Sequence, residues 1–140
     1  MLRKPTTERE SEMSAERRII ISCKSGVRVE AKLTDENPKT SDAIWNALPI
    51  EGNGNRWGDE IYFSTKVNLR EEKSRAEVAI GDLAYWPPGK AICIFFGPTP
   101  ASKGDEPRAA SPVNVFAKVT GDAALFKKVP DGDRVTLVKA

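Results

Sequence analysis

Histidine and glutamine are both absent from this chain of 140 residues. Without histidine, the sequence cannot form a Ser-His-Asp triad, a Cys-His pair or a histidine-based metal site. Any catalysis has to use carboxylates, lysine, arginine, tyrosine, cysteine or backbone groups. The absence therefore excludes the commonest arrangements for nucleophilic and metal-assisted hydrolysis.

Cysteine is scarce, since the chain has two, Cys23 and Cys93, in separate apolar segments. Two thiols are too few for a structural zinc site, which usually takes four Cys or His ligands. We therefore expect no metal and no cofactor. The pattern favours two buried free thiols, and a disulfide between them stays open because the distance between their Cα atoms decides it.

The excess of one charge is small, and long apolar runs are missing. The 22 basic and 20 acidic side chains give a formal charge of +2, which does not favour a nucleic-acid partner. No segment has the length of a membrane span or the apolar core of a signal peptide. We expect a cytoplasmic protein with neither a nucleic-acid nor a membrane partner.

Residues 1–17 are rich in charged and small polar side chains and poor in apolar ones. Such a segment buries too little apolar surface to offset the entropy that it would lose on ordering. We predict a disordered tail over residues 1–17 and one folded domain over residues 18–140, which is long enough to bury a core of its own.

Most of the domain alternates between apolar and polar residues, which is typical of strands with one buried face. The first two strands form a hairpin with a turn at Gly26. In VNVFAKV, the alternation places Val113, Val115, Ala117 and Val119 on one face. About eight strands are predicted, over residues 19–23, 27–33, 61–63, 78–80, 83–86, 91–96, 113–119 and 134–140.

Two segments change to helical spacing. ENPKTSDAIWNALP predicts a short helix with Asn37 as N-cap and Pro38 in the first turn, ending at Pro49. A second short helix is predicted over residues 123–128, with Asp122 as its N-cap. The REEKSR segment is interpreted as a solvated connection. Many short strands with two short helices favour a β-barrel or β-sandwich whose ends the helices cover.

Prolines, glycines and aromatic residues follow a fixed order in GDLAYWPPGKAICIFFGPTP, with RWGDEIYF before it and SPVNVFAKV after it. On these motifs, the sequence resembles the cyclophilin-like barrel family of small uncharacterised bacterial and archaeal proteins, from about Ile19 to Ala140. The resemblance implies a mainly β fold, a closed eight-stranded cyclophilin-like β-barrel with two short capping helices.

The resemblance implies a shape and no settled reaction. Prolyl isomerases of the cyclophilin class are similar in shape, but they carry a Phe-His-Arg stretch and a glutamine followed by glycines, and this chain has neither histidine nor glutamine. Arg56 and Arg108 lie outside any matching motif, so no catalytic residue is carried over. The barrel also resembles domains of allophanate-hydrolase-type amidohydrolase complexes, which keeps an enzyme subunit as an alternative.

Aromatic and arginine side chains gather around the prolines and in a glycine-rich loop. An arginine next to a tryptophan can bind a carboxylate or an amide while it stacks, and aromatic walls are typical of peptide grooves. The predicted ligand-binding residues are Arg56, Trp57, Tyr85, Trp86, Phe96 and Arg108. Core packing is the alternative for the aromatic residues, and alternation puts Phe95 and Phe96 on opposite faces.

A binding role is the interpretation that these observations favour. We predict a non-catalytic barrel that binds a peptide or a small molecule at its rim. Two alternatives stay open. One is an enzyme, either a peptidyl-prolyl isomerase or a subunit of an amidohydrolase complex, and the other is a homodimer formed through outward-facing aromatic side chains.

Overall fold

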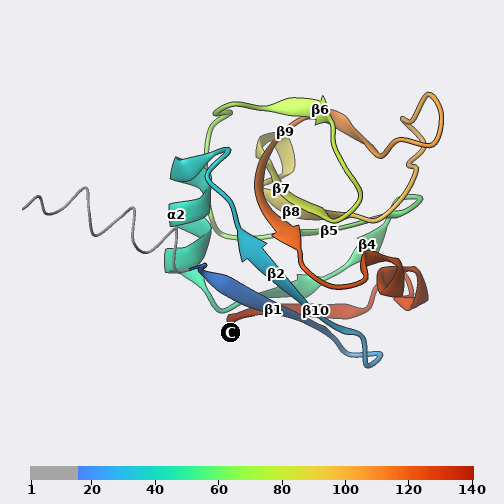
Figure 1. Cartoon of the computed structure of the whole chain (residues 1–140), viewed down its shortest axis with the longest axis horizontal. Coiled ribbons are helices and arrows are strands. Elements are labelled where there is room, and N and C mark those ends of the chain that lie inside the picture. Colours follow the sequence, from blue (N-terminus) through green and yellow to red (C-terminus); the bar gives the residue numbers. More distant parts are fainter. Residues whose placement is uncertain (1–15) are drawn as a thin grey trace, which may run out of the picture.

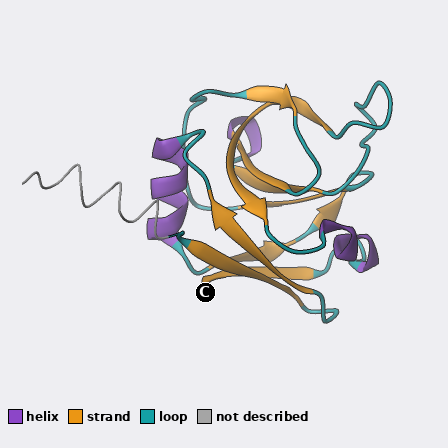
Figure 2. Cartoon of the chain, in the orientation of Figure 1, coloured by secondary structure: helices purple, strands orange, loops and turns teal. Residues whose placement is uncertain are grey.

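The structure is a computed structural model that describes residues 16–140, and strands make up most of it (Figure 1). The tail predicted over residues 1–17 lies outside the described residues except for its last two positions. One α-helix and two short 3-10 helices connect or flank the strands (Figure 2). Among residues 16–140, none of the helices has the length and apolar content that a membrane span requires.

The first hairpin follows from the alternation of apolar and polar residues. In β1 (Arg18–Cys23) and β2 (Arg28–Leu33), every second side chain is buried. Gly26 takes a φ of 113° in the turn between them, which suits a residue without Cβ. Strand β1 also pairs with β10 (Arg134–Lys139), so the first and last strands lie side by side (Figure 1).

The sheet has ten strands, two more than the sequence predicted. Besides the three above, they are β3 (Ile50–Asn53), β4 (Asn55–Arg56), β5 (Glu60–Ser64), β6 (Arg75–Glu77), β7 (Asp82–Trp86), β8 (Ala91–Phe95) and β9 (Arg108–Val119). Their order in the sheet is β3-β10-β1-β2-β9-β7-β8-β5-β4, and β6 pairs with β9 outside this path.

The strand ladders do not form the closed ring that a closed barrel would have. Within residues 16–140, they make a path with two ends, β3 and β4. These ends follow one another in the chain with Gly54 alone between them. One segment therefore pairs with β10 through its first half and with β5 through its second half.

Two strand positions differ from the prediction. Strand β6 lies at residues 75–77 instead of 78–80, because Ala79 enters a turn in which the Asp82 carboxylate accepts its N–H at 2.8 Å. Strand β9 begins at Arg108, a residue that the sequence placed in a polar loop, and its first half pairs with β6. Local side-chain hydrogen bonds and a distant partner strand set these boundaries.

A β-bulge divides β9 into two halves. Against β7, the pairing of β9 passes over Phe116, which is left as an extra residue. Alternation predicted residues 113, 115, 117 and 119 on one face, and this is wrong. Residues 113 and 115 belong to one cluster of buried side chains, whereas residues 117 and 119 belong to another.

Buried side chains form these two clusters on opposite faces of β7 and β8. The larger cluster contains Phe96, whose ring lies 5.9 Å from that of Phe126. The smaller cluster consists of Val78, Ala84, Cys93, Phe95, Ala109, Val113 and Val115. The predicted placement of Phe95 and Phe96 on opposite faces is therefore confirmed.

Helix α2 (Pro38–Ala47) begins with proline in its first turn, as predicted, but Asn37 is not its side-chain cap. The Asn37 amide donates to a backbone carbonyl of β9 at 2.9 Å and accepts the Lys73 backbone N–H at 2.6 Å. The Glu72 carboxylate instead accepts two backbone N–H groups of the first helical turn, at 3.2 and 3.1 Å. The REEKSR segment, predicted as a solvated connection, therefore caps the helix.

The second predicted helix is a 3-10 helix, η2 (Ala123–Lys128). The Asp122 carboxylate accepts the Ala124 N–H at 2.9 Å, so the predicted N-cap is confirmed. A further 3-10 turn, η1 (Pro87–Gly89), joins β7 to β8 at the two prolines, which cannot donate to a strand ladder.

The substitution Gly54→Ala is expected to lower the free energy of unfolding by about 1–3 kcal/mol. A Cβ at Gly54 would lie 2.8 Å from Ile61 Cγ2 and 3.0 Å from Val135 Cγ2, and both side chains are fully buried. Urea unfolding followed by circular dichroism measures the change. Gly121→Ala is the matched control, because a Cβ there meets nothing within 4 Å. Equal losses in the two variants would contradict the prediction.

Candidate ligand-binding pocket

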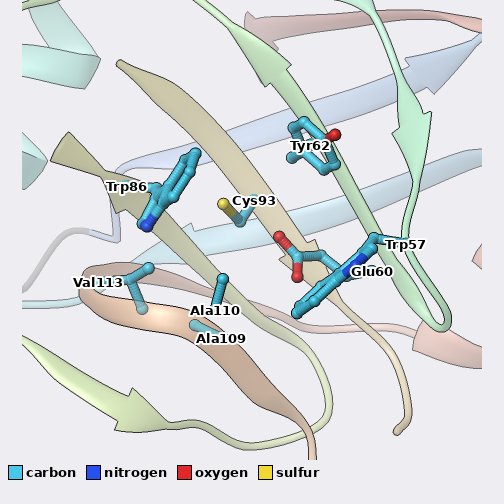
Figure 3. Close-up of a pocket in the computed structure, with 8 residues that line it drawn as sticks. All are labelled: Trp57, Glu60, Tyr62, Trp86, Cys93, Ala109, Ala110 and Val113. Atoms are coloured by element: carbon cyan, nitrogen blue, oxygen red, sulfur yellow. The ribbon is translucent and has the colours of Figure 1, made fainter. Parts of the chain in front are cut away.

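A cavity of about 220 Å³ lies on the side of the smaller cluster, between strands β5 and β8 and the first half of β9 (Figure 3). The lining residues are Trp57, Glu60, Tyr62, Trp86, Cys93, Ala109, Ala110 and Val113. Three of them are aromatic, one carries a carboxyl group, and the others are small or apolar. The cavity is therefore mostly apolar, with one acidic group in its wall.

Trp57 reaches the cavity from the turn between β4 and β5. The backbone N–H of Trp57 donates to the backbone carbonyl of Glu60 at 2.9 Å, and Gly58 takes a φ of 62° within this turn. A Cβ at Gly58 would lie 3.0 Å from the Pro98 carbonyl oxygen, and the Asp59 N–H donates to that same oxygen at 2.9 Å. The RWGD and GPTP motifs therefore pack on each other, which fixes the position of Trp57.

Trp86, at the end of β7, stands across the cavity from Trp57 (Figure 3). Its indole N–H donates to Ser111 Oγ on β9 at 2.7 Å. Its ring also packs against η1, where a Cβ on Gly89 would lie 2.6 Å from Trp86 Cζ3. The glycine of the PPG motif thus leaves room for the indole, and β9 sets its orientation.

The first half of β9 supplies a third wall with small side chains. Ala109 and Val113 are buried, and Ala110 is exposed. The bulge at Phe116 determines that residues 109 and 113 face the smaller cluster. Because no side chain in this wall is larger than valine, the space in front of the two tryptophans stays open (Figure 3).

Glu60 is the charged residue of the cavity lining, and it is buried, with 5% of its surface exposed. Its oxygen Oε1 has no hydrogen-bond partner among the described residues. The Cys93 thiol donates a hydrogen bond to the carboxyl group. Figure 3 shows the carboxyl group pointing into the space between Trp57 and Trp86.

Burial raises the pKa of Glu60 to about 7, because the ionised form loses its hydration, and the hydrogen bond from Cys93 opposes this rise in part. Burial and the neighbouring carboxyl group raise the pKa of the Cys93 thiol well above its usual range. Near neutral pH, the thiol therefore stays protonated, while the carboxyl group is close to half ionised. Glu60 can accept a hydrogen bond from a ligand or exchange a proton with it.

Of the six ligand-binding residues predicted from the sequence, the structure brings Trp57 and Trp86 together at the cavity. Tyr85 is fully buried, and its hydroxyl group forms hydrogen bonds with backbone groups of the loop after β5. Phe96 is buried in the larger cluster. The side chains of Tyr85 and Phe96 therefore belong to the core and not to the cavity wall.

The two arginines lie away from the cavity lining and have partners of their own. Arg56 donates to the Val129 carbonyl at 2.8 Å, and its guanidinium lies 5.0 Å from the centre of the Phe96 ring. Arg108 forms ion pairs of 3.3 and 3.2 Å with two glutamates. Arg56 and Trp57 therefore do not act as a pair, because the first points to η2 and the second to the cavity.

Sequence reasoning missed Glu60, Tyr62 and Cys93 as parts of the cavity wall. Glu60 and Tyr62 stand two residues apart on β5, so their side chains share a face, and the EIY pattern carries this signal. Cys93 lies opposite Tyr62 in the pairing of β5 with β8. That register is not readable from one sequence, because it depends on partners distant along the chain.

A second cavity, of about 470 Å³, lies between the end of α2, β3 and the segment after β5. It is lined by Ala47, Pro49, Ile50, Glu51, Ser64, Thr65, Lys66 and Val67. None of these is aromatic, and both charged residues are exposed. Within residues 16–140, no group of three or more His, Cys, Asp or Glu side chains is placed to hold a metal ion.

The fold and the cavity define a mainly β protein whose one sheet carries a small, mostly apolar pocket. The chain belongs to the cyclophilin-like family, whose sequence profile matches residues 17–138, so the resemblance read from the sequence is confirmed. It is also similar to the solution structure of a hypothetical protein from Archaeoglobus fulgidus. The two share 46% identity, the match covers 89% of this chain and 95% of that chain, and the TM-score is 0.75. No curated protein matches the chain.

The substitution Glu60→Gln is expected to stabilise the protein at pH 8 and to change its stability little at pH 4.5. The folded-state pKa of about 7 lies above the usual value of 4.5. Folding therefore favours the protonated form of Glu60. The contribution of this form to stability is lost as the pH rises from about 4.5 through about 7. At pH 8, the ionised carboxylate lowers the free energy of unfolding by about 3 kcal/mol. The uncharged glutamine side chain has no such cost.

Urea unfolding of both proteins at pH 4.5, 6 and 8 measures this difference. Glu51→Gln is the matched control, because Glu51 is exposed in the second cavity. A difference between Glu60→Gln and the unsubstituted protein that is the same at all three pH values would show that the charge of Glu60 is not responsible.

Proposed function

We propose that this protein is a non-catalytic binding protein for a small molecule, which it holds in the cavity between Trp57 and Trp86. The observation that carries the proposal is the carboxyl group of Glu60, which is buried at an apolar cavity with Oε1 unpartnered. Buried polar groups are nearly always hydrogen-bonded, and an unpaired one costs about 1–3 kcal/mol. A ligand in the cavity with a donor group would supply a hydrogen bond to this carboxyl group.

The size of the cavity favours a small molecule over a peptide. Its volume of about 220 Å³ holds one compact group, whereas a bound peptide needs a groove that accepts several residues in a row. Aromatic walls and one polar group that fixes orientation are the usual composition of a small-molecule site. The hydrogen bond to Ser111 already holds the Trp86 indole, so this side of the cavity does not have to be ordered when a ligand enters.

A fragment screen tests this proposal. Neutral and charged one-ring compounds are first screened by saturation-transfer NMR, and the compounds that bind are then titrated into the isotope-labelled protein. We expect some of them to shift the indole N–H signals of Trp57 and Trp86 and not that of Trp45. The substitution Ala110→Phe should abolish these shifts, because it fills the mouth of the cavity from an exposed position. Ala47→Phe, which fills the second cavity, should leave them unchanged.

The reverse pattern would refute the assignment of the site. Ligand shifts that survive in Ala110→Phe and disappear in Ala47→Phe would place binding in the second cavity. If no compound of the library shifts either tryptophan signal, the proposed function fails.

The prolyl isomerase alternative makes a different prediction. Isomerisation needs a donor that stabilises the twisted amide, and the guanidinium groups of Arg56 and Arg108 are held by other partners outside the cavity. We therefore expect no acceleration of cis/trans exchange in an Ala-Ala-Pro-Phe peptide, measured by NMR exchange spectroscopy. Acceleration that Ala110→Phe abolishes would contradict a non-catalytic role.

A further inference from the structure

The cavity lining carries one acidic group and no basic one. Among its eight residues, Glu60 is acidic, and none is lysine or arginine. Three aromatic rings, those of Trp57, Tyr62 and Trp86, surround the same space (Figure 3). The faces of aromatic rings bear partial negative charge and attract cations. The carboxylate and the rings therefore favour the same sign of ligand charge.

Every other class of ligand either makes no use of the carboxylate or the aromatic rings or is repelled by the carboxylate. An anionic ligand would face the Glu60 carboxylate in a site with little water, where like charges repel strongly. A purely apolar ligand would fill the space but offer no donor to the Glu60 carboxyl group. A neutral donor could bond to the Glu60 carboxyl group, but it would gain nothing from the electrostatics of the three rings. A cation with N–H groups can donate a hydrogen bond to the carboxylate and is attracted by the three aromatic rings.

We propose that the ligand is a small organic cation, an ammonium or amidinium group carried on a compact apolar body. This inference rests on the proposed binding function of the same cavity. The cationic N–H groups donate to the Glu60 carboxylate, and the apolar body lies between the two indoles, against the small side chains of β9. The volume of about 220 Å³ limits that body to about the size of one aromatic ring.

The surroundings of Glu60 predict how binding depends on pH. The groups that face it are the Cys93 thiol on β8, the rings of Trp57 and Tyr62 beside it, and the uncharged side chains of β9. Because the pKa of Glu60 is about 7, a cation that requires the carboxylate binds roughly 30-fold more weakly at pH 5.5 than at pH 8. A neutral ligand of the same shape shows no such dependence.

Three probes of one shape test the proposal, namely benzylammonium, benzyl alcohol and benzoate. Each is titrated into the full-length protein at pH 8 and pH 5.5, with the indole signals of Trp57 and Trp86 as the readout. At pH 8, we expect benzylammonium to bind most tightly, benzyl alcohol more weakly and benzoate most weakly. Because glutamine cannot ionise, Glu60→Gln should weaken benzylammonium binding at pH 8 by about 30-fold or more, and it should change that of benzyl alcohol less than about 2-fold.

The substitution Glu51→Gln serves as the matched control, because it removes the same charge from the second cavity. It should leave all three affinities unchanged. A general effect of net charge would instead weaken benzylammonium binding equally in both variants, and that result would overturn the proposed role of Glu60.

The remaining outcomes separate the ligand class from the proposed function. If benzyl alcohol or benzoate binds in the cavity as tightly as benzylammonium, the cationic class is wrong and the binding function stands. If fragments of other shapes bind there but none of the three probes does, the proposed class is again wrong. If neither the probes nor any fragment shifts the two indole signals, both proposals fail.

Discussion

The bulge at Phe116 is a single extra residue in β9 that sets the arrangement on both faces of the sheet. Beyond the bulge, β9 buries its side chains in the larger cluster, and before it, the same strand faces the smaller cluster and walls the cavity. Because strand side chains alternate with a period of two, one inserted residue exchanges the faces of every residue on one side of it. The small side chains at residues 109 and 113 line a cavity because of this exchange. The Ser111 hydroxyl group, on the same half of β9, accepts the hydrogen bond that orients Trp86.

Around that strand, the fold keeps a carboxyl group in an environment that disfavours its ionisation. Glu60 lies on β5 with aromatic rings on either side of it, and its oxygen Oε1 has no hydrogen-bond partner among the described residues. Local features that oppose stability without a compensating contact are typical of functional positions. The same group therefore connects the pH dependence of stability, the apolar walls of the cavity and the proposed preference for a cation.

Much of the fold could be predicted, because its signals are local. Alternation located the β1 and β2 hairpin, proline marked the start of α2, and an aspartate marked the start of η2. The errors arose where distant groups compete. Glu72 from a loop, and not Asn37, caps α2, and the change of partner strand at Gly54 leaves the ladders as an open path of nine strands, with β6 outside it. Of the residues that line the cavity, the sequence proposed the two tryptophans as candidate binding residues, whereas it did not propose the acidic group between them.

The sequence by itself determined the family, the mainly β composition, and the absence of histidine chemistry, because motif order and composition do not depend on how strands pair. It also contained the RWGD and PPG motifs, whose residues lie at the border of the cavity. Only the tertiary structure decided which aromatic residues are core and which are wall. That choice depends on strand register and on the Phe116 bulge, and both are set by contacts between segments far apart in the chain.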